Sequence, residues 1–205
     1  MILLVAWKVY CRSPMSRAPA SSSRGFTLVE LLVVIAMVGI LAALAIVGFR
    51  KYINAAGIAE PKAMIQLIRQ GEVQYKIDAA QYLGCAGCGP NGCAQGAGTL
   101  TTYYPMAAPS AKKYTWQQLT PEYECWRRMN VTTDGTVRFG YSVVAGGPTD
   151  AVKQPLGFAA LTPFQQPDDA WFVVQAAGNR DEDGTQALLC ANSWSNEVYF
   201  ENDTE

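Results

Sequence analysis

One uninterrupted apolar run dominates this sequence. The 24 residues from Phe26 to Phe49 include a single ionisable side chain, the carboxylate of Glu30. As a helix the run would be about 36 Å long, which exceeds the roughly 30 Å hydrocarbon core of a bilayer. It therefore predicts a membrane-spanning helix. A secretory signal peptide is the alternative, but no small-residue cleavage site follows Phe49 and the sequence continues directly into helical pattern.

Charge is distributed unevenly on the two sides of this run. The chain has 16 Lys plus Arg and 17 Asp plus Glu, and residues 1–25 contain four of the basic residues and no acidic one: Lys8, Arg12, Arg17 and Arg24. Residues 26–205 therefore carry 12 basic and 17 acidic residues, a net charge of −5. A basic leader before an apolar segment is typical of exported proteins whose N-terminus stays in the cytoplasm. We expect no nucleic-acid binding.

The leader, residues 1–25, opens with an apolar stretch of about ten residues, which is too short to span a bilayer. Initiation at Met15 would instead leave a short, basic, Ser-rich leader. We expect Met15 to be the initiator.

The residues after Lys51 predict a globular domain. Apolar residues recur at spacings of three and four as far as about Ile77, which predicts an amphipathic helix continuing the apolar one. A Gly-rich loop follows, from Gly84 to about Pro109. Alternating and apolar runs then predict four strands, near 136–146, 170–177, 185–191 and 196–201. The expected fold class is α+β, with a long helix packed on an antiparallel sheet. These patterns divide the chain into three predicted segments: a leader (1–25), a hydrophobic helix (26–53) and a globular domain (54–205).

The start of the apolar run carries a specific motif. The residues R-G-F-T-L-V-E, from Arg24 to Glu30, precede about twenty apolar residues. This resembles the class III signal peptide of type IV prepilins and of the pseudopilins of type II secretion. The resemblance implies the type IV pilin fold. It also implies that prepilin peptidase cuts between Gly25 and Phe26, and that Phe26 then becomes the N-methylated first residue.

Glu30 is unusual because a carboxylate inside a bilayer is unfavourable and normally has a partner and a function. No Lys or Arg lies within two helical turns on its C-terminal side. The resemblance implies a salt bridge between Glu30 and the new ammonium of Phe26 in a neighbouring subunit, which would set the register of the two helices. The alternative is a carboxylate that reaches the membrane interface and stays hydrated.

The function implied by the resemblance is structural. We expect a subunit of a type IV pilus or pilus-like filament, stored in the inner membrane as a single-pass precursor and then assembled into an extracellular pilus or a periplasmic pseudopilus. The expected partners are further copies or other pilins, prepilin peptidase, the inner-membrane assembly machinery and membrane lipid.

Two other functions stay open. The first is a pseudopilin of a type II secretion system. The second, from a different class, is a membrane-anchored extracytoplasmic domain for binding or thiol-redox chemistry. We expect no enzymatic activity, because the chain has no histidine, which is the commonest general base.

Six cysteines are present, and Cys11 lies in the leader. The other five are the disulfide candidates: Cys85, Cys88, Cys93, Cys125 and Cys190. An oxidising compartment predicts two disulfides and one remaining thiol, with at least one bridge from the 85–93 cluster to Cys125 or Cys190. The alternatives are a redox pair formed by Cys85 and Cys88, or a zinc site made of four cysteines.

A turn at residues 178–185 resembles half of a calcium loop. Asn179, Asp181 and Asp183 occupy alternate positions before Gly184, but Cys190 stands where an EF-hand requires glutamate. Some pseudopilins and related pilins bind calcium in a C-terminal loop of similar composition. Calcium is therefore the one possible cofactor, and an ordinary solvated turn is the alternative.

Overall fold

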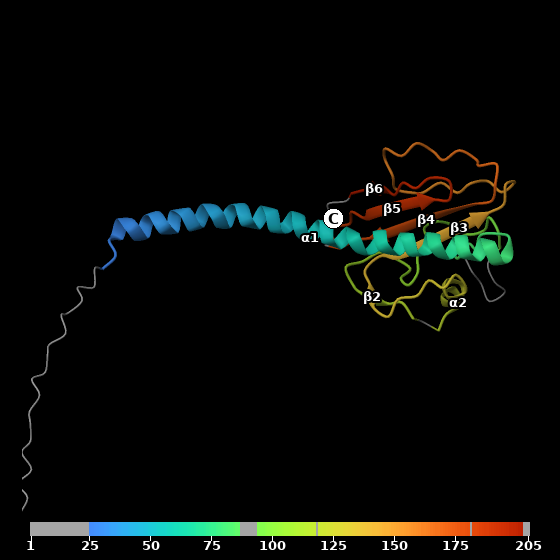
Figure 1. Cartoon of the computed structure of the whole chain (residues 1–205), viewed down its shortest axis with the longest axis horizontal. Coiled ribbons are helices and arrows are strands. Elements are labelled where there is room, and N and C mark those ends of the chain that lie inside the picture. The colour runs from blue at the N-terminus through green and yellow to red at the C-terminus, as the bar shows by residue number, and fades with distance from the viewer. Residues whose placement is uncertain (1–24, 87–93, 118, 181, 203–205) are drawn as a thin grey trace, which may run out of the picture. The chain divides into compact units, whose positions relative to one another are not determined.

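The computed structural model describes residues 25–86, 94–117, 119–180 and 182–202. The described residues up to Leu44 form one compact unit, and the residues from Ala45 onward form another. Helix α1, Leu28–Ala79, begins in the first unit and ends in the second (Figure 1).

The 52 residues of α1 confirm the predicted long helix. Glu30 in its first turn and Lys76 in its last turn both have the charge that favours the helix dipole. The helix stops at Ala79 because the next residue, Ala80, has a φ of 58° and turns the chain out of the helix, while its N–H still bonds to the carbonyl of Lys76.

The second unit contains a four-stranded antiparallel sheet whose strands follow one another in chain order. They are β3 (Gly140–Gly146), β4 (Trp171–Gly178), β5 (Ala187–Asn192) and β6 (Tyr199–Glu201). The α+β arrangement expected of a type IV pilin is therefore confirmed: a long N-terminal helix followed by an antiparallel sheet (Figure 1).

The first predicted strand, 136–146, is not continuous. Its start forms β2 (Thr136–Val137), which pairs with β1 (Tyr114–Thr115) in a separate two-stranded sheet. Only the part from Gly140 onward pairs with β4. The strand breaks because its two parts have hydrogen-bond partners in different sheets.

Both faces of the larger sheet are buried. On one face, Ile65 and Ile68 of α1 pack with Val143, Val174 and Leu189. The other face forms a smaller cluster of Val144, Trp171 and Val173 with Ala86 and Leu100, which come from the segments after α1. The alternation in the sequence predicts only a half-buried strand, because it does not reveal that these later segments cover the outer face.

Helix α2, Pro121–Arg128, is an element that the sequence analysis did not predict. Its signals are nevertheless present. Thr120 is the N-cap and its hydroxyl accepts a bond from the N–H of Tyr123, while Pro121 occupies the first helical position. The helix brings Cys125 and Trp126 into the core, where Trp126 packs against Trp116 at 5.4 Å between ring centroids.

Candidate assembly site

The candidate assembly site is the start of α1, formed by Glu30 in its first turn and by Gly25, Phe26 and Thr27, which directly precede the helix. Thr27 is the residue before the helix, and its carbonyl accepts the N–H of Leu31 at 3.2 Å. Its hydroxyl accepts the N–H of Glu30 at 3.2 Å. In return, Oε2 of Glu30 accepts both the N–H and the hydroxyl of Thr27, each at 2.9 Å. This reciprocal pattern is a capping box, which satisfies N–H groups that a helix start otherwise leaves unpaired.

Thr27 is a site residue that the sequence analysis missed. The signal was available, because Thr-x-x-Glu before an apolar run is the sequence pattern of a capping box. Glu30 therefore has a local structural partner in its own chain. Its second oxygen, Oε1, has no hydrogen-bond partner among the residues that the structure describes, so it is available to another donor.

The predicted salt bridge between Glu30 and Phe26 stays a prediction. In the uncleaved chain the nitrogen of Phe26 is a peptide amide, so the ammonium that would pair with Glu30 does not yet exist. Gly25 and Phe26 directly precede the capping box, and the Phe26 side chain is 84% exposed. A Cβ built on Gly25 meets no atom within 4 Å, so the bond to be cut is not enclosed by the described residues.

None of the described residues covers the apolar half of α1. Residues 28–49 form the one helix, among those described, that is long and apolar enough to cross a membrane, and none of its residues is buried. Apolar surface of this extent is rare on a soluble monomer and marks contact with lipid or with other protein.

The same segment matches a family model. Residues 20–46 fit the prokaryotic N-terminal methylation motif. The chain carries the class III signal peptide of type IV pilin-like proteins. The motif and the uncovered apolar helix together fit a membrane-anchored precursor. No curated protein and no solved structure matches the chain.

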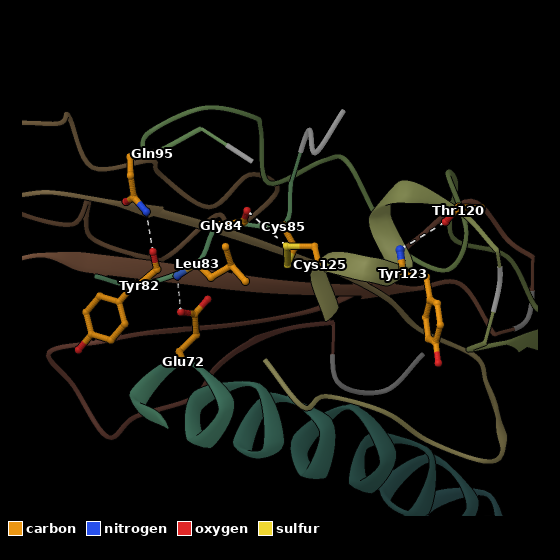
Figure 2. Close-up of a disulfide and its surroundings, with 9 residues drawn as sticks. All are labelled: Glu72, Tyr82, Leu83, Gly84, Cys85, Gln95, Thr120, Tyr123 and Cys125. Atoms are coloured by element: carbon orange, nitrogen blue, oxygen red, sulfur yellow. Dashed lines mark hydrogen bonds between the residues drawn. A yellow bond between two sulfur atoms is a disulfide. The ribbon is translucent and has the colours of Figure 1, made fainter. Parts of the chain in front are cut away.

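The globular part of the chain contains a disulfide, as the sequence predicts. It joins Cys85 to Cys125 across 40 residues of sequence. Cys85 lies just after α1 and bonds through its N–H to the carbonyl of Val143 at 2.9 Å, while Cys125 belongs to α2. The disulfide therefore ties α2 to the segment that borders β3 (Figure 2).

This pairing corrects two of the cysteine expectations. Cys190 is a disulfide candidate in the sequence, but in the structure it is a free thiol. It is fully buried in β5, which pairs with β4 on one side and with β6 on the other. Burial raises the pKa of this thiol to about 12. Cys85 cannot form the alternative redox pair with Cys88 while it is bonded to Cys125. Cys88 and Cys93 lie outside the described residues.

The candidate calcium turn connects β4 to β5. Oδ1 of Asn179 accepts the N–H of Glu182 at 2.8 Å, and Oδ1 of Asp183 accepts the N–H of Thr185 at 2.7 Å. These are local bonds of a kind common in turns. Asp181 lies outside the described residues, and no group of three acidic, Cys or His side chains suited to a metal occurs in the described part of the chain. A calcium site here stays a prediction.

Proposed function

We propose that this chain is the structural subunit of a type IV pilus or pilus-like filament and that it assembles through α1 after cleavage behind Gly25. The observation that carries the proposal is a coincidence at one position. The start of α1 and the start of the apolar segment both fall at Leu28, three residues after Gly25 and within the methylation motif at residues 20–46. A single cut would therefore release a charged amine directly beside a capped helix whose apolar side is left exposed by the residues that the structure describes.

Glu30 has a dual role in this proposal. Its Oε2 stays with Thr27, which fixes the orientation of the carboxylate. Its Oε1 is the acceptor for the Phe26 ammonium of a neighbouring subunit. Such an ion pair contributes little net stability, because both charges must leave water, but it selects one register among many similar apolar contacts.

The decisive test compares filament assembly for the wild type and Glu30→Ala in the native host. Sheared surface material is inspected by electron microscopy, and mass spectrometry identifies this chain and its N-terminal residue. Wild-type material should contain filaments of a chain that begins with N-methylated Phe26. Glu30→Ala should enter the membrane and be cleaved, yet assemble poorly or not at all. Glu124→Ala, which removes an exposed carboxylate from α2, is the matched control and should assemble normally.

A second variant separates processing from folding. Gly25→Val should block the cut, and the added side chain has free space in the folded chain. Uncleaved, folded protein in the membrane is the expected result.

Normal filaments from Glu30→Ala would contradict the proposal and favour an anchored domain that functions without this site. Filaments that stay in the periplasm would identify the pseudopilin alternative.

A further inference from the structure

A hollow of about 330 Å³ lies between α1 and the strands in the globular unit. We call it the Glu60 hollow. It is lined by Glu60, Met64 and Leu67 of α1, by Val137 and Tyr141, and by threonines of the segment 132–136. Met64 and Val137 are buried and form an apolar wall, whereas Thr132 and Thr136 are exposed. The hollow thus combines an apolar interior with polar groups, as small-molecule sites do.

Tyr141, which lines this hollow, has an unsatisfied polar atom. Its side chain is fully buried, and its hydroxyl has no hydrogen-bond partner among the described residues. The ring is held in place by Trp116, whose ring centroid lies 5.8 Å away. Buried hydroxyls without a partner are unusual in folded proteins, so this one calls for a group that enters from outside. Burial and the negative charge of Glu60 raise the pKa of Tyr141, which keeps the phenol neutral and its oxygen able to accept a hydrogen bond.

Glu60 brings a charge that is not neutralised. One of its oxygens, Oε1, accepts the backbone N–H of Arg138 at 2.8 Å. No ion pair of Glu60 occurs within the described part of the chain. It is also the one ionised side chain among the residues that line the hollow, since Tyr141 stays neutral. An anionic ligand would be repelled here, and a cation would be attracted.

We propose that the Glu60 hollow binds a primary ammonium group carried on a short alkyl chain. The ammonium has three N–H donors. The acceptors are Oε2 of Glu60, the hydroxyl oxygen of Tyr141 and a threonine hydroxyl at the rim, while the alkyl chain packs on Met64 and Val137. A neutral alcohol has one donor and no charge, and a quaternary ammonium has no N–H donor. Both should bind less well. The ammonium could belong to a free amine or to a lysine side chain of a second copy.

The test uses the methyl group of Met64 as a reporter. The full chain is labelled with ¹³C at its methionine methyl groups, purified in a non-ionic detergent and titrated with n-butylammonium at pH 7. The Met64 signal is assigned with Met64→Leu. Met106 and Met129, which are buried but do not line the hollow, are internal controls. We expect a saturable shift of the Met64 signal, with n-butanol and tetramethylammonium at least tenfold weaker.

Two variants test the roles of the polar groups. Glu60→Gln should weaken butylammonium binding at least tenfold, and Tyr141→Phe about threefold or more, whereas Glu124→Gln should leave binding unchanged. Trp fluorescence checks that each variant is folded. No saturable Met64 shift, equal binding of n-butanol, or unchanged binding in Glu60→Gln would overturn the proposal and leave a hollow filled by water.

A dilution series of the chain alone identifies the source of the ammonium. A Met64 signal that moves with protein concentration, and is displaced by butylammonium, indicates a lysine of a second copy. A signal that is independent of concentration but responds to butylammonium indicates a free amine. Either result supports the proposed chemistry.

Discussion

The carboxyl group of Glu72, on α1, accepts a hydrogen bond of 2.8 Å from the backbone N–H of Leu83, and the Glu72 residue is completely buried (Figure 2). Its other oxygen has no hydrogen-bond partner among the described residues. Leu83 is two residues before Cys85, so this bond and the disulfide hold neighbouring parts of one segment. Glu72 lies within the helix predicted to continue as far as about Ile77, and no pattern in the sequence marks it as a buried acid.

The stability of the chain should therefore depend on pH through Glu72. Burial raises the pKa of Glu72 to about 8, although the Leu83 N–H lowers it in part. The folded chain thus retains a proton that the unfolded chain releases near pH 4.5. This contribution to stability is complete below about pH 4.5 and is lost as the pH rises through 8. The loss between pH 5 and pH 8 is about 3 kcal/mol.

Glu72→Gln provides the matched comparison, because glutamine keeps an acceptor for Leu83 but does not titrate in this range. The free energy of unfolding is measured by Trp fluorescence in denaturant, with the full chain in non-ionic detergent. The wild type should lose stability relative to Glu72→Gln between pH 5 and pH 8. Parallel pH profiles for the two proteins would show that Glu72 is ionised in the fold.

Removal of the Cys85–Cys125 disulfide should destabilise the globular unit. The bridge closes a loop of 40 residues, and the chain-entropy model assigns about 4 kcal/mol to a loop of that length. The double variant Cys85→Ser, Cys125→Ser should therefore unfold at a lower denaturant concentration than the oxidised wild type. Its midpoint should not change with a reductant, whereas that of the wild type should fall. An unchanged wild-type midpoint in the presence of reductant would contradict the pairing of Cys85 with Cys125.

Cys190 should be unreactive in the folded chain. The thiolate is the reactive form of cysteine, and here the thiol is fully buried with a pKa raised to about 12. Iodoacetamide at pH 8 should leave Cys190 unmodified in the native protein and alkylate it in denaturant, as measured by peptide mass spectrometry. Rapid native alkylation would mean that β5 is open to solvent, contrary to the structure.

Gly71→Ala should disrupt the contact between α1 and the end of α2. A Cβ at Gly71 would lie 2.5 Å from the carbonyl oxygen of Met129 and 2.9 Å from a methyl carbon of Val131. Because one of these atoms belongs to the backbone, the clash can be relieved only if whole elements move. We expect the free energy of unfolding to fall by about 1 to 3 kcal/mol. Gly39→Ala is the control, since its Cβ meets no atom within 4 Å. Equal stability of the two variants would argue against this close packing.

Thr27→Val should weaken the first turn of α1 because valine removes both hydroxyl bonds of the capping box. Loss of an N-cap side chain is worth about 1 kcal/mol, or roughly a fivefold faster hydrogen exchange at the amides of residues 30 and 31. Thr27→Ser, which keeps the hydroxyl, should exchange like the wild type. The measurement is hydrogen exchange of the full chain in detergent micelles. Similar protection in all three proteins would exclude a role for the cap.

The sequence was informative about features that depend on neighbouring residues along the chain. The apolar run that begins at Phe26 and the α+β order of elements follow from composition and periodicity, and the motif around Gly25 is identified by its resemblance to a known signal peptide. The capping box is equally local, since Thr27 and Glu30 are three residues apart, and the Thr-x-x-Glu pattern was sufficient to predict it. For such features the physical cause lies within one or two helical turns.

Tertiary structure alone decided the relationships between distant residues. The sequence left the partner of Cys85 open, and only packing brought Cys125 of α2 beside it while keeping Cys190 inside the sheet. The burial of Glu72 and of the Tyr141 hydroxyl could not be predicted, because both residues fit ordinary amphipathic patterns. Their environments result from elements that arrive tens of residues later in the chain, and no local pattern records which elements these will be.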